Sequence, residues 1–167
     1  MSSGGGRREE DFNIWHDKEV RFDVAASALN PGRGEVPLQT LAPVEDHKGN
    51  NGAPGRLTFT NLRIIWYLAK SNKVNLSIGL GCVISVSTAK TKSYLLKGEG
   101  SSIVMMTRFN NSRFEFVFTT EADKTKQAVA TLEVGWKSLH SALASHLGST
   151  VHGCRYLQAR RVKTQRR

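Results

Sequence analysis

Apolar and polar residues alternate in short runs along most of this chain, and near residue 120 the apolar spacing changes to intervals of three and four. Alternation over about four to eight residues is typical of half-buried β-strands, whereas the longer spacing predicts one apolar face of a helix. A single amphipathic helix is not stable alone in water, so its apolar stripe must pack against the strands. The sequence therefore predicts a β-layer closed by one C-terminal helix.

The alternating runs define the expected strands, and turn residues follow each of them. A first strand is expected at 20–24, and residues 43–55 are expected to form the longest early loop. Seven further strands, spaced by about ten residues, favour a small barrel or sandwich rather than a parallel sheet. Apolar positions from Val129 to Leu147 predict the helix over 122–147. The seven strands are expected at 35–41, 56–60, 63–68, 74–79, 82–87, 103–107 and 113–119.

Strands followed by a capping helix indicate the fold class: mainly β, a pleckstrin-homology-like (GRAM-type) seven-strand barrel or sandwich capped by one C-terminal α-helix. The expected organisation is a flexible N-terminal segment over 1–19, the domain over 20–147 and a basic, disordered C-terminal tail over 148–167. No apolar run approaches the roughly 20 residues of a membrane-spanning helix, so no integral membrane protein is expected. Cys82 and Cys154 match no disulfide or zinc spacing, which favours a reducing, cytoplasmic compartment.

Positive charge is concentrated in the middle of the chain. Residues 48–113 hold ten basic residues and one acidic residue, Glu99, whereas residues 1–47 have a net charge of −4. Such a segment attracts an anionic surface, which could be lipid headgroups, nucleic acid or an acidic protein. Cations in or beside the connections between strands are well placed to meet that surface. The candidate lipid-binding residues are Lys48, Arg56, Lys70, Lys73, Arg108 and Arg113, with Lys90, Lys92 and Lys97 in a loop as a secondary basic patch.

No recognised catalytic motif is present in the sequence: it lacks a Gly-x-Ser-x-Gly elbow, a Walker motif and a His-Glu-x-x-His pair. His47, beside Asp46 and Lys48, has no partner nucleophile, and the other histidines are too dispersed for a metal site. We therefore expect a non-enzymatic protein with no cofactor and no metal. The basic tail favours binding to nucleic acid. Nucleic-acid binding also needs a platform of exposed aromatic residues, which the sequence does not predict, so we expect no nucleic-acid partner.

Several ordered blocks lie within about residues 20–120, among them Lys48-Gly49-Asn50-Asn51-Gly52, Thr60-Asn61-Leu62-Arg63-Ile64-Ile65-Trp66 and Val74-Asn75-Leu76-Ser77-Ile78-Gly79. These blocks resemble those of a known family, the fifth Bardet–Biedl syndrome protein, a subunit of the BBSome of ciliary membrane traffic. The resemblance implies pleckstrin-like domains, phosphoinositide binding and partnership with other BBSome subunits. It also implies a location at the cilium, the ciliary basal body, the ciliary membrane periphery and the cytoplasm, with a role in ciliary membrane protein trafficking and cilium assembly. The family has two tandem domains where this chain has one.

The resemblance also implies roles for single residues. Asn61, Arg63 and Trp66 match the structural signature of the barrel, with Trp66 expected in the core and Arg63 expected to link strands. By analogy with the superfold, three loops converge at the open end opposite the helix and gather the six candidate cations into one phosphoinositide site. The alternative is a protein-interaction adaptor within the complex that binds no lipid.

Overall fold

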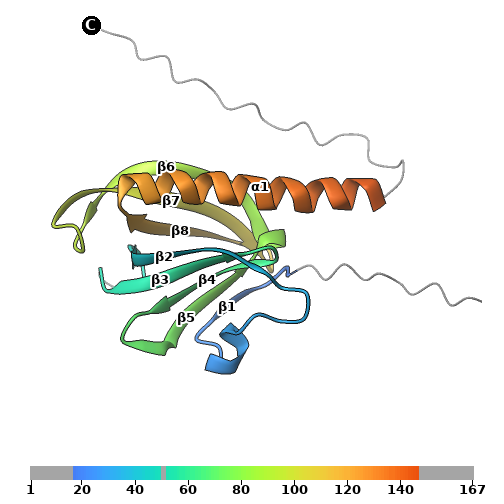
Figure 1. The fold of residues 1–167 in the computed structure, drawn as a ribbon, viewed down its shortest axis with the longest axis horizontal. Helices are drawn as coiled ribbons and strands as arrows, with labels where there is room; N and C mark the ends of the chain where they lie inside the picture. The colour runs from blue at the N-terminus through green and yellow to red at the C-terminus, as the bar shows by residue number, and fades with distance from the viewer. Residues whose placement is uncertain (1–16, 50–51, 147–167) are drawn as a thin grey trace, which may run out of the picture.

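A computed structural model describes residues 17–49 and 52–146 (Figure 1). They form one antiparallel sheet of eight strands, in the order β1-β5-β4-β3-β2-β8-β7-β6, and one long helix, α1. The tail expected over 148–167, and most of the segment expected over 1–19, lie outside the described residues. The elements are β1 (Val20–Phe22), a short 3-10 helix (Ala26–Leu29), β2 (Pro37–Asp46), β3 (Pro54–Thr60), β4 (Arg63–Leu68), β5 (Ser71–Gly79), a second 3-10 helix (Leu80–Cys82), β6 (Val83–Ser93), β7 (Gly98–Phe109), β8 (Ser112–Thr120) and α1 (Ala122–His146).

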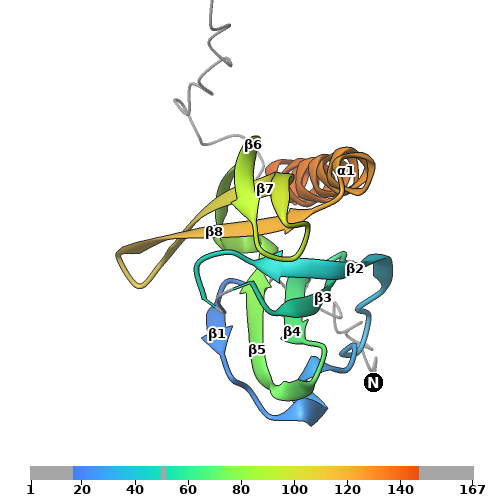
Figure 2. The same ribbon diagram turned by 90° about the vertical axis from the view of Figure 1, so that its left-hand side faces the viewer.

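The predicted architecture, strands closed by a C-terminal helix, is confirmed. Strands β2 to β8 correspond to the seven further strands expected. Strand β1 corresponds to the first strand expected at 20–24, two residues shorter, and lies at the edge of the sheet along β5. The helix α1 lies across β6, β7 and β8 and also contacts β2 (Figure 1). The view of Figure 2 shows the sheet curving beneath α1, with β1 and β5 on the side away from the helix. Within the described part of the chain, no helix has the length and apolar character needed to cross a membrane.

The prediction of a loop over 43–55 is wrong at both of its ends, because β2 extends to Asp46 and β3 begins at Pro54. Strand β2 continues to Asp46, because a register shift between Leu41 and Val44 lets its pairing with β3 resume after Pro43. Val44 is fully buried, and Glu45 and Asp46 pair with β8. Strand β2 therefore joins the two halves of the sheet, pairing with β3 along its length and with β8 at its end.

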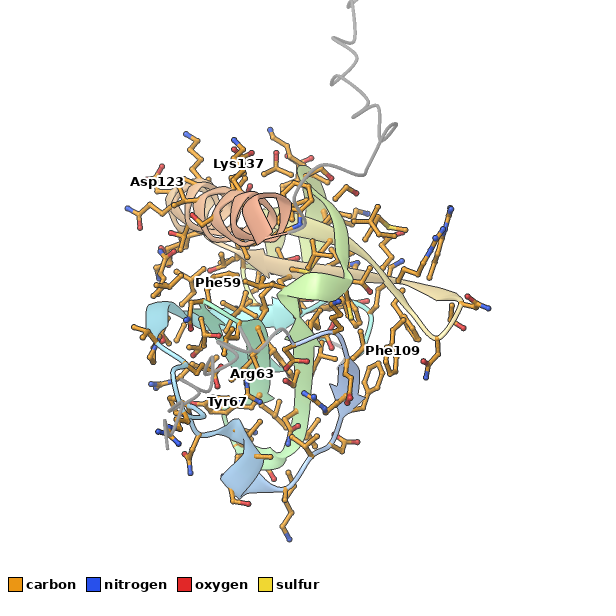
Figure 3. The ribbon with its side chains drawn as sticks, turned by 90° about the vertical axis from the view of Figure 1, so that its right-hand side faces the viewer. Phe59, Arg63, Tyr67, Phe109, Asp123 and Lys137 are labelled. Atoms are coloured by element: carbon orange, nitrogen blue, oxygen red, sulfur yellow. The ribbon has the colours of Figure 1, made fainter. Side chains whose placement is uncertain are left out.

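The hydrophobic core lies between the curved sheet and α1. Trp66 and Phe59 are its largest fully buried side chains, and Leu132 contributes from α1. Of the stripe predicted from the spacing of three and four, Leu132 is buried in this core and Val129 and Trp136 pack against it. Its later members, from position 139 on, lie outside the side chains that the structure describes. Figure 3 shows Phe59 in the interior, with Asp123 and Lys137 on the outer side of the helix.

Arg63, the first residue of β4, is buried and has a hydrogen-bond acceptor for each of its five N–H donors. Its Nε and Nη2 donate to the two carboxylate oxygens of Glu35 at 2.8 and 3.0 Å. Nη1 donates to the carbonyl of Ala28 and the hydroxyl of Ser77, and Nη2 donates to the carbonyl of Asn30. Arg63 thereby fastens the segment before β2 onto β4 and β5.

The other two residues of the signature also make contacts inside the fold. The Asn61 side chain accepts a hydrogen bond from the Val36 N–H at 2.7 Å and donates one to the Gly34 carbonyl at 3.0 Å. Trp66 is 1% exposed, and its indole N–H donates to the Val44 carbonyl at 3.2 Å. All three signature residues therefore hold together segments that are distant in the sequence.

Replacing Arg63 by glutamine should lower the free energy of unfolding by about 3–5 kcal/mol, because it leaves the buried carboxylate of Glu35 without its ion-pair partner. Urea denaturation measures this loss. Arg56→Gln is a matched control, since Arg56 is exposed on the neighbouring strand β3, and it should change the value by less than about 0.5 kcal/mol. Equal effects of the two substitutions would contradict the role assigned to Arg63.

The acid stability of the protein should depend on Glu35. Burial on its own raises the pKa of this carboxyl, but hydrogen bonds from Arg63 and from the Gly32 N–H outweigh burial and leave the pKa below its ordinary value of 4.5. A carboxyl with a lowered pKa stabilises the fold above the unfolded-state pKa, and this contribution is lost as the pH falls through the folded-state pKa. Urea denaturation at a series of pH values below 4.5 should show a steeper loss in the parent than in Glu35→Gln. The same pH dependence of the free energy of unfolding in the parent and in Glu35→Gln would refute this role of Glu35.

Candidate functional site

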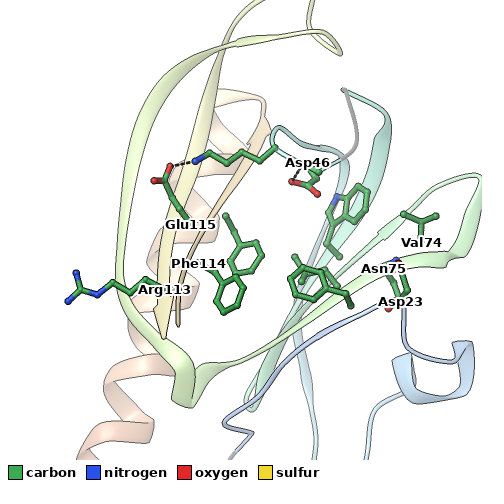
Figure 4. Close-up of a pocket in the computed structure, with 13 residues that line it drawn as sticks. Asp23, Asp46, Val74, Asn75, Arg113, Phe114 and Glu115 are labelled. Carbon is green, nitrogen blue, oxygen red and sulfur yellow. Dashed lines mark hydrogen bonds and ion pairs between the residues drawn. The ribbon is translucent and has the colours of Figure 1, made fainter. Parts of the chain in front are cut away.

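A groove of about 470 Å³, called here the aromatic groove, opens between the β2–β3 loop, β5 and the start of β8 (Figure 4). Its aromatic lining consists of Trp66, Phe22, Phe114 and Phe116. Alternation along β8 places Phe114 and Phe116 on the same face, with ring centroids 6.3 Å apart. Phe22 lies 6.3 Å from both rings and is 56% exposed. The aromatic groove therefore has an apolar floor with one ring open to solvent.

Two of the predicted cations, Lys48 and Arg113, line the aromatic groove together with three carboxylates, those of Asp23, Asp46 and Glu115. The Lys48 ammonium lies 2.9 Å from the Glu115 carboxylate, as the dashed line in Figure 4 marks. These two side chains are 52% and 41% exposed, so their ion pair contributes at most about 1 kcal/mol. An incoming anion can therefore replace Glu115 beside Lys48 at small cost.

Arg108 and Arg113 occupy directly opposite positions on β7 and β8, next to the turn that joins these strands. Both are exposed, and both line a second groove beside Cys82. Like charges directly opposite on a sheet repel each other and destabilise it. An anion bound between the two guanidinium groups would remove this repulsion.

The other three candidates of the predicted lipid site line neither groove. Arg56 lies on the outer face of β3, opposite Tyr67, since its neighbours Gly55 and Leu57 are buried. Lys70 is exposed in the turn between β4 and β5, and Lys73 is exposed in β5. The β4–β5 hairpin lies at the same end of the sheet as the β2–β3 loop (Figure 1). The structure thus joins Lys48 with Arg113 and Arg113 with Arg108, while a single site of six cations stays a prediction.

The secondary basic patch was expected in a loop, which is wrong for two of its three residues. Lys90 and Lys92 lie in β6, because that strand stays paired with β7 as far as Ser93. Only Lys97 lies in the turn. Lys92 and Lys97 line a third groove, of about 810 Å³, which also contains His47 and Tyr94. We call it the hairpin groove.

The Cys82 thiol is buried, whereas the His47 side chain is partly exposed. Burial raises the pKa of the Cys82 thiol, the wrong direction for a nucleophile. Nδ1 of His47 lies 3.5 Å from the carboxylate of Glu45, which is part of the sheet interior. Among residues 17–49 and 52–146, no group of three or more His, Cys, Asp or Glu side chains could hold a metal ion.

The sequence alone did not point to Phe22 in the aromatic groove or to Tyr94 in the hairpin groove. Phe22 belongs to a strictly alternating strand, so only its pairing at the sheet edge shows that the ring stays half outside the core. Tyr94, Leu95 and Leu96 form an apolar triplet flanked by Lys92 and Lys97 at a turn. That local pattern was a usable signal, because turn residues are ordinarily polar.

Comparison with known proteins identifies relatives of this chain. The model of the family described as "Bardet-Biedl syndrome 5 protein N-terminal PH-like domain" matches residues 35–141. The chain is 44% identical over 106 residues to the BBSome complex member BBS5 of Danio rerio and 42% identical over 106 residues to that of Homo sapiens, covering 64% of this chain in both cases. It is 36% identical over 113 residues, or 65% of this chain, to the BBSome complex member bbs-5 of Caenorhabditis elegans. The match covers 31% of each relative, so the chain spans about a third of their length.

Two solved structures share the fold. The Vps36 N-terminal PH domain aligns with a TM-score of 0.50 and 19% identity, covering 67% of this chain and 86% of that chain. The hSac2 domain from human phosphoinositide phosphatase Sac2 aligns with a TM-score of 0.51 and 14% identity, covering 84% of this chain and 89% of that chain. These similarities, with the family match, confirm the predicted pleckstrin-homology-like fold.

Removing the repulsion between Arg108 and Arg113 should stabilise the protein. Arg108→Thr is expected to raise the free energy of unfolding by about 0.5 kcal/mol at low salt, because a threonine opposite Arg113 carries no like charge. Urea denaturation measures the gain, which should shrink in high salt as the charges are screened. The control Arg56→Thr should show no gain, since Arg56 faces Tyr67. A loss of stability in Arg108→Thr would show that the paired arginines serve the fold.

Proposed function

We propose that this chain is a non-enzymatic membrane-binding module of a BBSome-type complex. The proposal starts from the family, since the chain belongs to that of the Bardet-Biedl syndrome 5 protein N-terminal PH-like domain. Relatives over this domain are named BBSome complex members. In this proposal the domain binds a phosphoinositide headgroup at the periphery of the ciliary membrane. It joins other BBSome subunits in the cytoplasm and at the ciliary basal body, and acts in ciliary membrane protein trafficking and cilium assembly.

The observation that carries the lipid half of the proposal is the exchangeable ion pair of Lys48 and Glu115 in a groove also lined by Arg113. A headgroup phosphate that replaces the Glu115 carboxylate receives charge-assisted hydrogen bonds from Lys48 and Arg113. Lys70 and Lys73, on the hairpin at the same end of the sheet, each add roughly 1 kcal/mol near an anionic membrane. The sum corresponds to weak binding that depends on salt.

Two substitutions on the same ion pair should change lipid binding in opposite directions. Glu115→Gln frees Lys48 and is expected to strengthen binding to phosphoinositide vesicles, whereas Lys48→Gln removes the cation and should weaken it about fivefold, the equivalent of roughly 1 kcal/mol. Vesicle flotation at fixed salt, with phosphatidylcholine vesicles as the reference, measures both effects.

The control for overall charge is Lys126→Gln on the outer face of α1, where the lysine is 80% exposed and remote from the groove. It removes one positive charge, as Lys48→Gln does, and should leave flotation nearly unchanged. Equal losses from Lys48→Gln and Lys126→Gln would mean that net charge alone attracts the membrane. Equal binding of the parent to neutral vesicles would remove the lipid half of the proposal.

A second candidate function, an adaptor that binds protein and no lipid, is favoured by the exposed ring of Phe22. An apolar side chain from another subunit that covered Phe22 would complete the cluster formed with Phe114 and Phe116. Recovery of the assembled complex distinguishes the two functions. The adaptor predicts that Phe22→Ser lowers recovery while Lys48→Gln leaves it unchanged.

A further inference from the structure

The hairpin between β6 and β7 carries apolar side chains at its tip. Tyr94 is 74% exposed, more than any other large apolar side chain among the described residues, and Leu96 is 37% exposed. Burial of such side chains is the main favourable term in association, so exposing two of them on a four-residue turn is unfavourable in water. Exposed apolar side chains grouped at one turn point to a site of interaction.

Buried hydrogen bonds fix the shape of this tip. The Ser93 hydroxyl donates to the Glu45 carboxylate at 2.7 Å and accepts a hydrogen bond from the Leu96 N–H at 3.0 Å. Glu45 is fully buried in β2, so the turn is attached to the interior of the sheet. Gly52 of the β2–β3 loop packs so closely on Tyr94 that no Cβ would fit there. Because the tip is already ordered, an interaction with it costs little conformational entropy.

Lysines surround the apolar tip. Lys90 and Lys92 precede it on β6, and Lys97 lies in the turn itself. Glu99 on β7 lies opposite Lys92 and forms an exposed ion pair with Lys90 at 3.7 Å, so three lysines against one glutamate leave the tip with a net positive charge. Lys97 has a backbone φ of +53°, in the left-handed region that favours glycine. The combination of an aromatic ring, a leucine and a collar of cations matches the interface of an anionic bilayer, where amphipathic rings and lysines are enriched.

We propose that the β6–β7 hairpin inserts Tyr94 and Leu96 into the headgroup region of an anionic membrane. The proposal rests on the proposed function in that the surface bound is a membrane, and it adds a second contact, separate from the aromatic groove. Figure 1 places this hairpin at the same end of the sheet as the β2–β3 loop and the β4–β5 hairpin, and Figure 2 views that end directly. The apolar tip therefore lies at the end of the sheet that also carries the segments of Lys48, Lys70 and Lys73.

Flotation of the full chain with vesicles tests the insertion. The double substitution Tyr94→Ser with Leu96→Ser should weaken binding to vesicles of phosphatidylcholine and phosphatidylserine about tenfold, because it removes the apolar contact and keeps every charge. The matched control is Val36→Ser with Val134→Ser. These two valines are 55% and 68% exposed, so the control removes a similar apolar surface elsewhere, and it should bind as the parent does.

A probe on the tip measures insertion directly. Tyr94→Cys, in a Cys154→Ser background, accepts a polarity-sensitive fluorophore, since the remaining cysteine, Cys82, is buried. Its emission should shift to shorter wavelength with anionic vesicles, whereas the same label at Lys126→Cys on α1 should not shift. Unchanged emission at position 94, together with unchanged flotation of the serine variant, would overturn the insertion.

The outcomes separate the insertion from the headgroup site. If adding a phosphoinositide to phosphatidylserine vesicles changes nothing while the serine variant still binds less, the headgroup site fails and the insertion stands. If the phosphoinositide matters and the serine variant binds as the parent does, the insertion fails alone. A serine variant that binds vesicles normally but no longer co-purifies with a second protein would assign the tip to a protein partner and refute the insertion.

Discussion

The hydrogen bonds of the buried Glu45 carboxylate fix the end of the sheet that carries the β2–β3 loop and the β6–β7 hairpin. Glu45 lies on β2, opposite Thr119 of β8, and accepts hydrogen bonds from the Ser93 hydroxyl at 2.7 Å and the Leu95 N–H at 3.4 Å. A buried carboxylate is costly unless it is hydrogen-bonded, so the β6–β7 turn must keep its donors in place for the sheet to close. One side chain thereby couples the end of β2, the start of the β2–β3 loop and the β6–β7 hairpin.

The polar contacts that hold the scaffold differ in strength from those around Lys48 and the hairpin lysines. Near the β3–β4 turn, Arg63 and Glu35 form a buried ion pair in which every N–H donor of Arg63 has an acceptor. Asn61 holds the segment before β2 through two hydrogen bonds. These contacts stabilise the fold and expose no charge to a ligand. At the other end, Lys48 and the lysines of the hairpins are exposed or paired only in weak ion pairs. Strong polar contacts therefore hold the scaffold, and weak ones remain available for exchange.

The fold could be predicted from the sequence because the hydrophobic period decides it. Alternation through Phe114, Phe116 and Phe118 and the spacing from Val129 onward place both faces of the core without long-range information. The site could not be predicted to the same extent. The sequence placed Pro43 in a loop. Strand β2 continues past Pro43 through a register shift that depends on the pairing with β3, which no local pattern shows. Likewise, the partnership of Lys48 with Glu115 joins residues 67 positions apart, and no local pattern encodes it.

The binding contacts of this end are individually weak, and their number matters more than the strength of any one. An exposed ion pair of the Lys48 type contributes at most about 1 kcal/mol, and each further lysine adds a similar amount only while salt is low. An apolar tip contributes a term that salt does not screen, so it would hold the protein on a membrane where charges alone would release it. A second membrane site held close to this one would multiply the affinity through a high effective concentration. Weak contacts on one rigid end are thus sufficient for reversible binding of the kind proposed.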